Sequence, residues 1–210
     1  MQHDPVDIAA AQALHPNWQQ GDHIIARLAR NAAEHPRDVA MRERDRGIWQ
    51  EYSWSDYLNA VIEFAAGLEG RGVKPGDVVL AIGDNRPNLY FGMLGVATLR
   101  AIPSPAYAEA PTDELAAQME REAIRFAIAE DQEQVDKLTE VRERYAALDL
   151  IIYDDPRGLA GNEPEGVVGF DTIREEGRQR LAAEPGLADA LIARPSIHDI
   201  VVLMHSSVTT

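Results

Sequence analysis

The stretch VVLAIGDNRP, residues 78–87, combines a short apolar run with the signals of a turn and of a helix start. All five residues at 78–82 are apolar, with no polar residue alternating between them, which is typical of a strand buried on both faces. Gly83, Asp84 and Asn85 are turn residues, and Pro87 suits the first position of a helix. The stretch therefore predicts a buried strand, a loop and a helix.

The same pattern recurs along the chain as AIPSP (101–105), RFAIA (125–129) and LIIY (150–153). Helical segments separate these runs, one capped at Thr112 and one starting near Asp131, where charged residues cover Val135, Leu138 and Val141. Short apolar runs alternating with helices indicate parallel strands joined by helical crossovers. We therefore expect an α/β fold with a largely parallel sheet flanked by helices.

The segment before residue 73 has a different organisation. Helical periodicity begins at Ile24 and is stopped by Pro36, and Gly47 separates two β-type segments, 39–44 and 48–52, as in a hairpin. The next helix can be capped by either Ser53 or Ser55 and ends near Gly70 and Gly72.

Beyond residue 153 the sequence is rich in glycine and proline. Residues 156–169, PRGLAGNEPEGVVG, predict an exposed excursion, followed by a helix over 171–183. The apolar residues 200–204 predict a last strand, which leads into the hydroxyl-rich end HSSVTT. Such an end is either a frayed terminus or a phosphate-binding loop.

Composition narrows the functional classes. A formal charge of −15, with no basic stripe, argues against nucleic acid as a partner. The chain has no cysteine, which excludes thiolate zinc sites and favours a reducing, cytoplasmic location. Its six histidines have no metal-binding spacing, so we expect no metal site within the protein itself. No apolar run is long enough to span a bilayer, which leaves open a peripheral contact with lipid.

The loop at residues 83–87 follows the carboxyl end of a strand, where open α/β sheets bind ligands. Arg86 and the amides of the next helix could bind an anion. The alternative, which we favour, is an ordinary turn in which Arg86 is simply exposed. Glu130 and Asp131 are adjacent carboxylates, but adjacency in sequence does not place them in one site.

Several segments together resemble the amino-terminal part of AMP-forming acyl-CoA synthetases, and most closely the bacterial long-chain fatty acid CoA ligases. They are RERDRGIWQEYSWSDY, GVKPGDVVLAIGDNRP, AEDQEQVDKL, YDDPRGL and DIVVLMHSSVTT, in that order. The resemblance implies an enzyme of the adenylate-forming superfamily that uses ATP, magnesium and coenzyme A. Such an enzyme joins ATP to a fatty acid as an acyl adenylate, and then passes the acyl group to coenzyme A.

The resemblance also assigns the end of the chain to the loop that binds the ATP triphosphate. The residues that map onto this loop are His205, Ser206, Ser207, Val208, Thr209 and Thr210. Hydroxyls and backbone amides suit phosphate oxygens, and magnesium offsets the triphosphate charge. The chain departs from the family pattern at Val208, where the family keeps a glycine. A β-branched residue resists positive φ, and its methyl groups keep phosphate away from the backbone.

By this resemblance, residues 21–210 form an incomplete amino-terminal AMP-binding domain that stops within the phosphate loop, after an extension over residues 1–20. We expect this piece alone to be catalytically inactive. Two alternatives stay open. A degenerate, noncatalytic module of the same fold would bind a partner protein and no nucleotide, as Val208 favours. An unrelated nucleotide-binding α/β protein lacks support, because neither GxGxxG nor GxxxxGK[ST] occurs.

Overall fold

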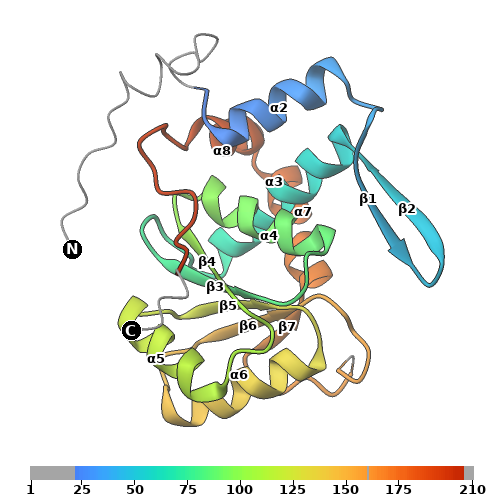
Figure 1. The fold of residues 1–210 in the computed structure, drawn as a ribbon. Helices are drawn as coiled ribbons and strands as arrows, with labels where there is room; N and C mark the ends of the chain where they lie inside the picture. The colour runs from blue at the N-terminus through green and yellow to red at the C-terminus, as the bar shows by residue number, and fades with distance from the viewer. Residues whose placement is uncertain (1–21, 160, 206–210) are drawn as a thin grey trace.

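A computed structural model describes residues 22–159 and 161–205, and its centre is a five-stranded parallel sheet (Figure 1). The strand order is β4-β3-β5-β6-β7, and every pair of neighbours is parallel. The strands are β3 (Val78–Ile82), β4 (Ile102–Ala106), β5 (Phe126–Ala129), β6 (Leu150–Tyr153) and β7 (Val167–Gly169). The expected α/β class is confirmed, and each of the four apolar runs found in the sequence lies in this sheet.

Helices cover both faces of the sheet (Figure 1). On one face lie α2 (Ile24–Glu34), α3 (Trp54–Gly70), α4 (Pro87–Thr98), α7 (Phe170–Ala183) and α8 (Leu187–Ala193). On the other face lie α5 (Thr112–Glu122) and α6 (Gln132–Arg144). Both faces therefore bury apolar side chains, which is why the strands read as continuous apolar runs. Among the described residues, no helix is long and apolar enough to cross a membrane.

Helices α3 and α7 pack against each other more closely than ordinary side chains allow. The rings of Phe64 and Phe170 stack with centroids 4.1 Å apart. Gly67, one turn after Phe64, and Gly177, two turns after Phe170, face the opposite backbone. A Cβ built on Gly177 would lie 1.8 Å from the carbonyl oxygen of Glu63. The two glycines therefore permit the close approach of the helices.

The predicted hairpin is present and projects from the body of the molecule (Figure 1). Strand β1 (Val39–Asp45) pairs with β2 (Ile48–Ser53) in antiparallel register. Its two turn residues, Arg46 and Gly47, both have positive φ, of 46° and 83°, as a two-residue type I′ turn requires. Where β2 leads into α3, the Tyr52 ring contacts Phe91 of α4 edge-on at 5.5 Å, which joins the hairpin base to the helical layer.

Of the two candidate caps of α3, the structure selects Ser53. Its hydroxyl accepts a hydrogen bond from the Asp56 amide at 3.1 Å, and the Asp56 carboxylate accepts one from the Ser53 amide at 3.0 Å. These reciprocal bonds form a capping box. The hydrogen bonds from Ser53 lower the pKa of Asp56, despite the opposing effect of burial.

We expect Ser53→Ala to lower the free energy of unfolding by about 1 kcal/mol, the usual loss for an N-cap. Urea denaturation at neutral pH measures this difference. Ser55→Ala is the matched control, because Ser55 lies inside the helix, where alanine has the higher helix propensity. Equal losses in the two variants would contradict the assignment of the cap.

Three details of the sequence analysis need correction. The stretch 156–169 is not wholly an exposed excursion, because Val167 pairs with Ile151 and starts β7. Thr112 begins α5 but does not cap it, since the cap position is Pro111. Helix α8 was not expected. These elements of three and seven residues are too short for apolar periodicity to reveal.

The strand expected at 200–204 is absent: residues 201–205 have no regular secondary structure. The segment makes one backbone contact with β4, in which the Leu203 amide donates to the Pro103 carbonyl at 2.9 Å. In a strand the nitrogen and the carbonyl of one residue face the same side, so the nitrogens of Pro103 and Pro105 face this outer edge. Proline nitrogens cannot donate, so no ladder of hydrogen bonds can form here.

Candidate functional site

The carboxyl ends of β3, β5 and β6 lie level with one another. Ile82 pairs with Ala129, and Ala129 pairs with Tyr153. The residues that follow these strands, which include Glu130 and Asp154, therefore meet at one edge of the sheet. This edge is where ligands bind in open α/β folds.

Gly83 allows the loop after β3 to pass close to the end of β5. Its φ is 143°, and a Cβ built on it would lie 2.4 Å from the Cβ of Glu130. The approach lets the amide of Asp84 donate to the Glu130 carboxylate at 2.6 Å. Asp131, by contrast, caps α6 by accepting from the Gln134 amide. The two adjacent carboxylates therefore serve different elements and do not form an acid–base pair.

Arg86 is not simply exposed, as the sequence analysis had favoured. Its side chain is 29% exposed and is surrounded by carboxylates at the sheet edge. The guanidinium lies 2.8 Å from Glu43 of β1, 3.6 Å from Glu130 and 4.0 Å from Asp155. Burial lowers its pKa, but the hydrogen bond to Glu43 and the surrounding negative charges raise it above the usual value. Arg86 therefore ties the hairpin to the sheet.

Asp154 and Asp155 are neighbours in the chain but are perturbed in opposite directions. Burial raises the pKa of Asp154, against a hydrogen bond from the Asn88 side chain at 2.6 Å and the charge of Arg86. The hydrogen bond from Arg157 lowers the pKa of Asp155, against the effect of burial. Among the carboxylates at this edge, Asp154 is the one whose ionised form is most clearly disfavoured by burial.

The two pKa shifts predict opposite effects of pH on stability. Asp154, whose pKa is raised on folding, favours the folded state at low pH, where it is protonated, and this contribution is lost as the pH rises from about 4 through the raised pKa. Asp155, whose pKa is lowered, stabilises the fold above about pH 4, and this contribution is lost as the pH falls.

We therefore expect Asp154→Asn to gain stability relative to the wild type as the pH rises from about 3.5 to 7, and Asp155→Asn to lose it. An asparagine at 154 can still accept from Asn88. Urea denaturation of both variants over this pH range measures the two slopes. Slopes of the same sign would contradict the assignment of the two carboxylates.

The charged side chains at this edge are paired with one another: Arg86 lies against three carboxylates, and Asp154 accepts from Asn88. The recess there, between Leu89 and Ile128, is narrow and too small for a nucleotide. In the described part of the chain, no group of three or more histidine and acidic side chains could hold a metal ion. The edge is a structural junction that joins the hairpin, α4 and three strands.

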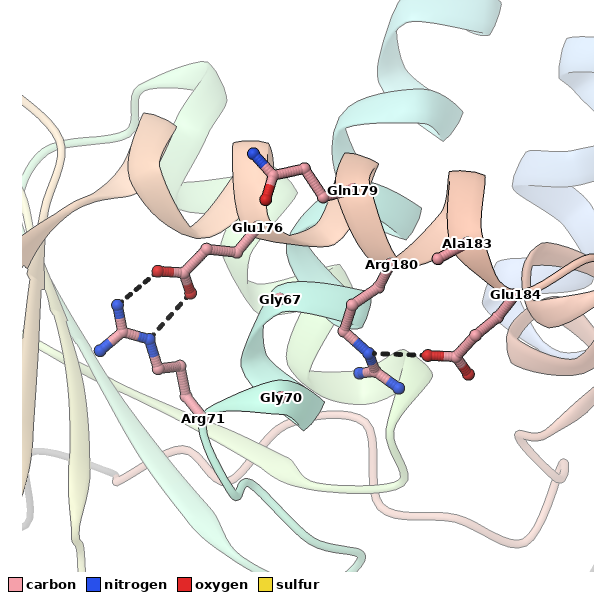
Figure 2. Close-up of a pocket in the computed structure, with 8 residues that line it drawn as sticks. All are labelled: Gly67, Gly70, Arg71, Glu176, Gln179, Arg180, Ala183 and Glu184. Atoms are coloured by element: carbon pink, nitrogen blue, oxygen red, sulfur yellow. Dashed lines mark hydrogen bonds and ion pairs between the residues drawn. The ribbon is translucent and has the colours of Figure 1, made fainter.

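A second, shallow pocket lies on the outer surface between α3 and α7, and Figure 2 shows the side chains that line it. Arg71, which follows the last residue of α3, donates two hydrogen bonds to the Glu176 carboxylate of α7, at 2.5 and 2.8 Å (Figure 2). Arg180 donates to the Ala66 carbonyl at 2.6 Å and contacts Glu184 at 3.3 Å. These charged groups are therefore paired within the protein.

The predicted phosphate loop lies almost wholly outside the described residues. Ser206, Ser207, Val208, Thr209 and Thr210 are beyond residue 205, and only His205 is placed. Its imidazole Nε2 lies 2.5 Å from a carboxylate oxygen of Glu122, at the end of α5. The sequence analysis had not singled out Glu122, which no motif marks.

Solved structures share this arrangement of a parallel sheet covered on both faces by helices. MbtA of Mycobacterium smegmatis superposes with a TM-score of 0.75, at 19% identity, over all of this chain and 36% of its own. The anthranilate–CoA ligase AuaEII superposes with a TM-score of 0.71, at 18% identity, over 94% of this chain and 34% of its own.

Sequence comparison extends the likeness from fold to family. The AMP-binding enzyme family matches residues 28–210, so the chain belongs to that family. The curated relative 4-coumarate–CoA ligase 4 of Arabidopsis thaliana is 26% identical over 158 residues, which make up 75% of this chain. The chain spans about a quarter of that relative's length, 26%.

Proposed function

We propose that this chain is the amino-terminal part of an AMP-forming ligase that activates a carboxylic acid with ATP and transfers the acyl group to coenzyme A. The family match carries the proposal, because it includes the hydroxyl-rich end of the chain. Ser206, Ser207, Thr209 and Thr210 would donate hydroxyl and amide hydrogens to the ATP phosphates. Magnesium would offset the phosphate charge.

We further propose a long-chain fatty acid as the acid substrate, on the strength of the sequence resemblance alone. Relatives by sequence and by fold include ligases named for 4-coumarate and for anthranilate, so an aromatic acid is the competing choice. We also propose a cytoplasmic location, which the lack of cysteine favours, with only peripheral contact with lipid.

The test is acid-dependent exchange of labelled pyrophosphate into ATP, with heat-killed protein as the control. It is run on the whole protein and on residues 1–210 alone, with palmitate, 4-coumarate and anthranilate in parallel. We expect exchange with palmitate in the whole protein and none with residues 1–210. A preference for an aromatic acid would leave the ligase reaction standing and overturn the fatty acid. Exchange with none of these acids, in the whole protein and in its Val208→Gly variant, would overturn the ligase.

Val208 favours the alternative of a noncatalytic module, and one variant separates the two functions. If valine blocks the approach of phosphate, Val208→Gly should raise the exchange rate of the whole protein. A whole protein that is inactive both with valine and with glycine, and that binds a protein partner stoichiometrically, would support the noncatalytic module instead.

A further inference from the structure

A network of polar side chains, buried except at His205, links α5 to the last described residue of the protein. The Gln118 amide donates to the Ser104 hydroxyl at 3.0 Å, and that hydroxyl donates to the Glu122 carboxylate at 2.7 Å. The other Glu122 oxygen lies 2.5 Å from Nε2 of His205. Ser104 is fully buried and the Glu122 side chain is 6% exposed. These contacts join β4 to α5 and to the segment that ends at His205.

The hydrogen bonds of this network lead to the Glu122 carboxylate, from Gln118 by way of Ser104 and from His205 directly. Ser104 donates to one oxygen, and His205 can donate to the other through Nε2, with Arg121 at 3.5 Å. An ionised carboxylate only accepts hydrogen bonds, so this arrangement suits it. A charged acceptor also makes the stronger hydrogen bonds, particularly away from water. The carboxylate is therefore fixed before His205 binds to it.

The backbone alone holds the segment before His205 weakly. The one backbone bond between this segment and β4 is the bond from Leu203 to Pro103, because the outer edge of β4 presents proline nitrogens. The direction in which the chain leaves the sheet must then depend on side chains. At the end of this segment, the half-exposed imidazole of His205 contacts the buried carboxylate of Glu122.

We propose that Glu122 is a positioning residue for the phosphate loop. It binds the imidazole of His205 and so fixes the position of this residue, with which the proposed phosphate loop begins. This inference rests on the proposed function, in which those residues bind ATP phosphates. Phosphate binding depends on the position of the binding groups. Losing the contact between Glu122 and His205 should therefore weaken ATP binding without removing any group that contacts phosphate.

The test uses Glu122→Gln, which keeps the side-chain volume and can still accept from Ser104. Nuclear magnetic resonance of the 210-residue chain follows the His205 ring signals and the hydrogen exchange of the Leu203 amide. We expect the Leu203 amide to exchange about tenfold faster in Glu122→Gln than in the wild type. A hydrogen bond to a charged group stabilises a structure by a free energy that corresponds to about this factor. Glu120→Gln, an exposed change on the same helix, is the control and should change neither signal.

A titration with magnesium ATP, followed through the amide signals, gives the functional result. We expect Glu122→Gln to raise the apparent Kd about five- to tenfold, and His205→Ala to do the same without any change in the core. Unchanged ring signals and Leu203 exchange in Glu122→Gln would overturn the proposal. The proposal would also be overturned if Glu122→Gln released His205 but left the affinity for ATP unaltered. If the wild-type chain binds no ATP, the ligand proposal fails, and the exchange data alone decide whether Glu122 positions His205.

Discussion

Replacing Gly177 by alanine should destabilise the protein by about 3 kcal/mol or more, at the upper end of what overpacking costs. The added Cβ would lie 1.8 Å from the carbonyl oxygen of Glu63, and 2.9 Å from the amide nitrogen of Gly67. Both neighbours are backbone atoms of α3, so no side chain can rotate away. The two helices would have to separate, which would break the stacking of Phe64 on Phe170.

Urea denaturation of the wild type and the variant measures this loss. Gly70→Ala is the matched control, since Gly70 ends the neighbouring helix and a Cβ there would meet only the flexible Arg180 side chain, at 3.4 Å. That change should be neutral or slightly stabilising, because alanine has the higher helix propensity. Equal stability of Gly177→Ala and Gly70→Ala would refute the close contact between the helices.

Replacing Arg86 by alanine should destabilise the protein by about 2 to 3 kcal/mol, between the values for exposed and buried ion pairs. The guanidinium is the positive charge among Glu43, Glu130 and Asp155, each of which is less than a fifth exposed. Without it, these carboxylates repel one another and the hairpin loses its link to the sheet.

The control is Arg157→Ala, because Arg157 is 72% exposed and pairs locally with Asp155. Its loss should be within about 0.5 kcal/mol, as for other exposed pairs. A double-mutant cycle with Glu43→Gln then isolates the link between hairpin and sheet. Urea denaturation supplies the four free energies. Additive losses from Arg86 and Glu43 would show that their contact contributes nothing.

Much of the fold was predictable because its signals are local. Four continuous apolar runs indicated the parallel strands, and the turn at Gly47 indicated the hairpin. Pro87 and Asp131 marked the starts of α4 and α6. Each signal acts through the conformation of a few adjacent residues, so it can be read without knowing what those residues contact.

Several errors occurred where pairing partners are distant in the sequence. Val167 forms a strand because β6 offers it an edge, and its own three-residue segment carries no strand signal. Residues 200–204 carry a strand signal but meet an edge whose nitrogens belong to prolines. The ion pairs of Arg86 join residues 43, 130 and 155, and sequence spacing does not bring these together.

The sequence by itself determined the fold class and the family, because these follow from residue type and order. The assignment of its hydroxyl-rich end to a phosphate loop stays a prediction. Tertiary structure alone decided that Glu122 lies against His205. It also decided that α3 and α7 meet through glycine. Both contacts depend on how elements far apart in the chain pack, and packing geometry is a property of the folded core rather than of any local segment.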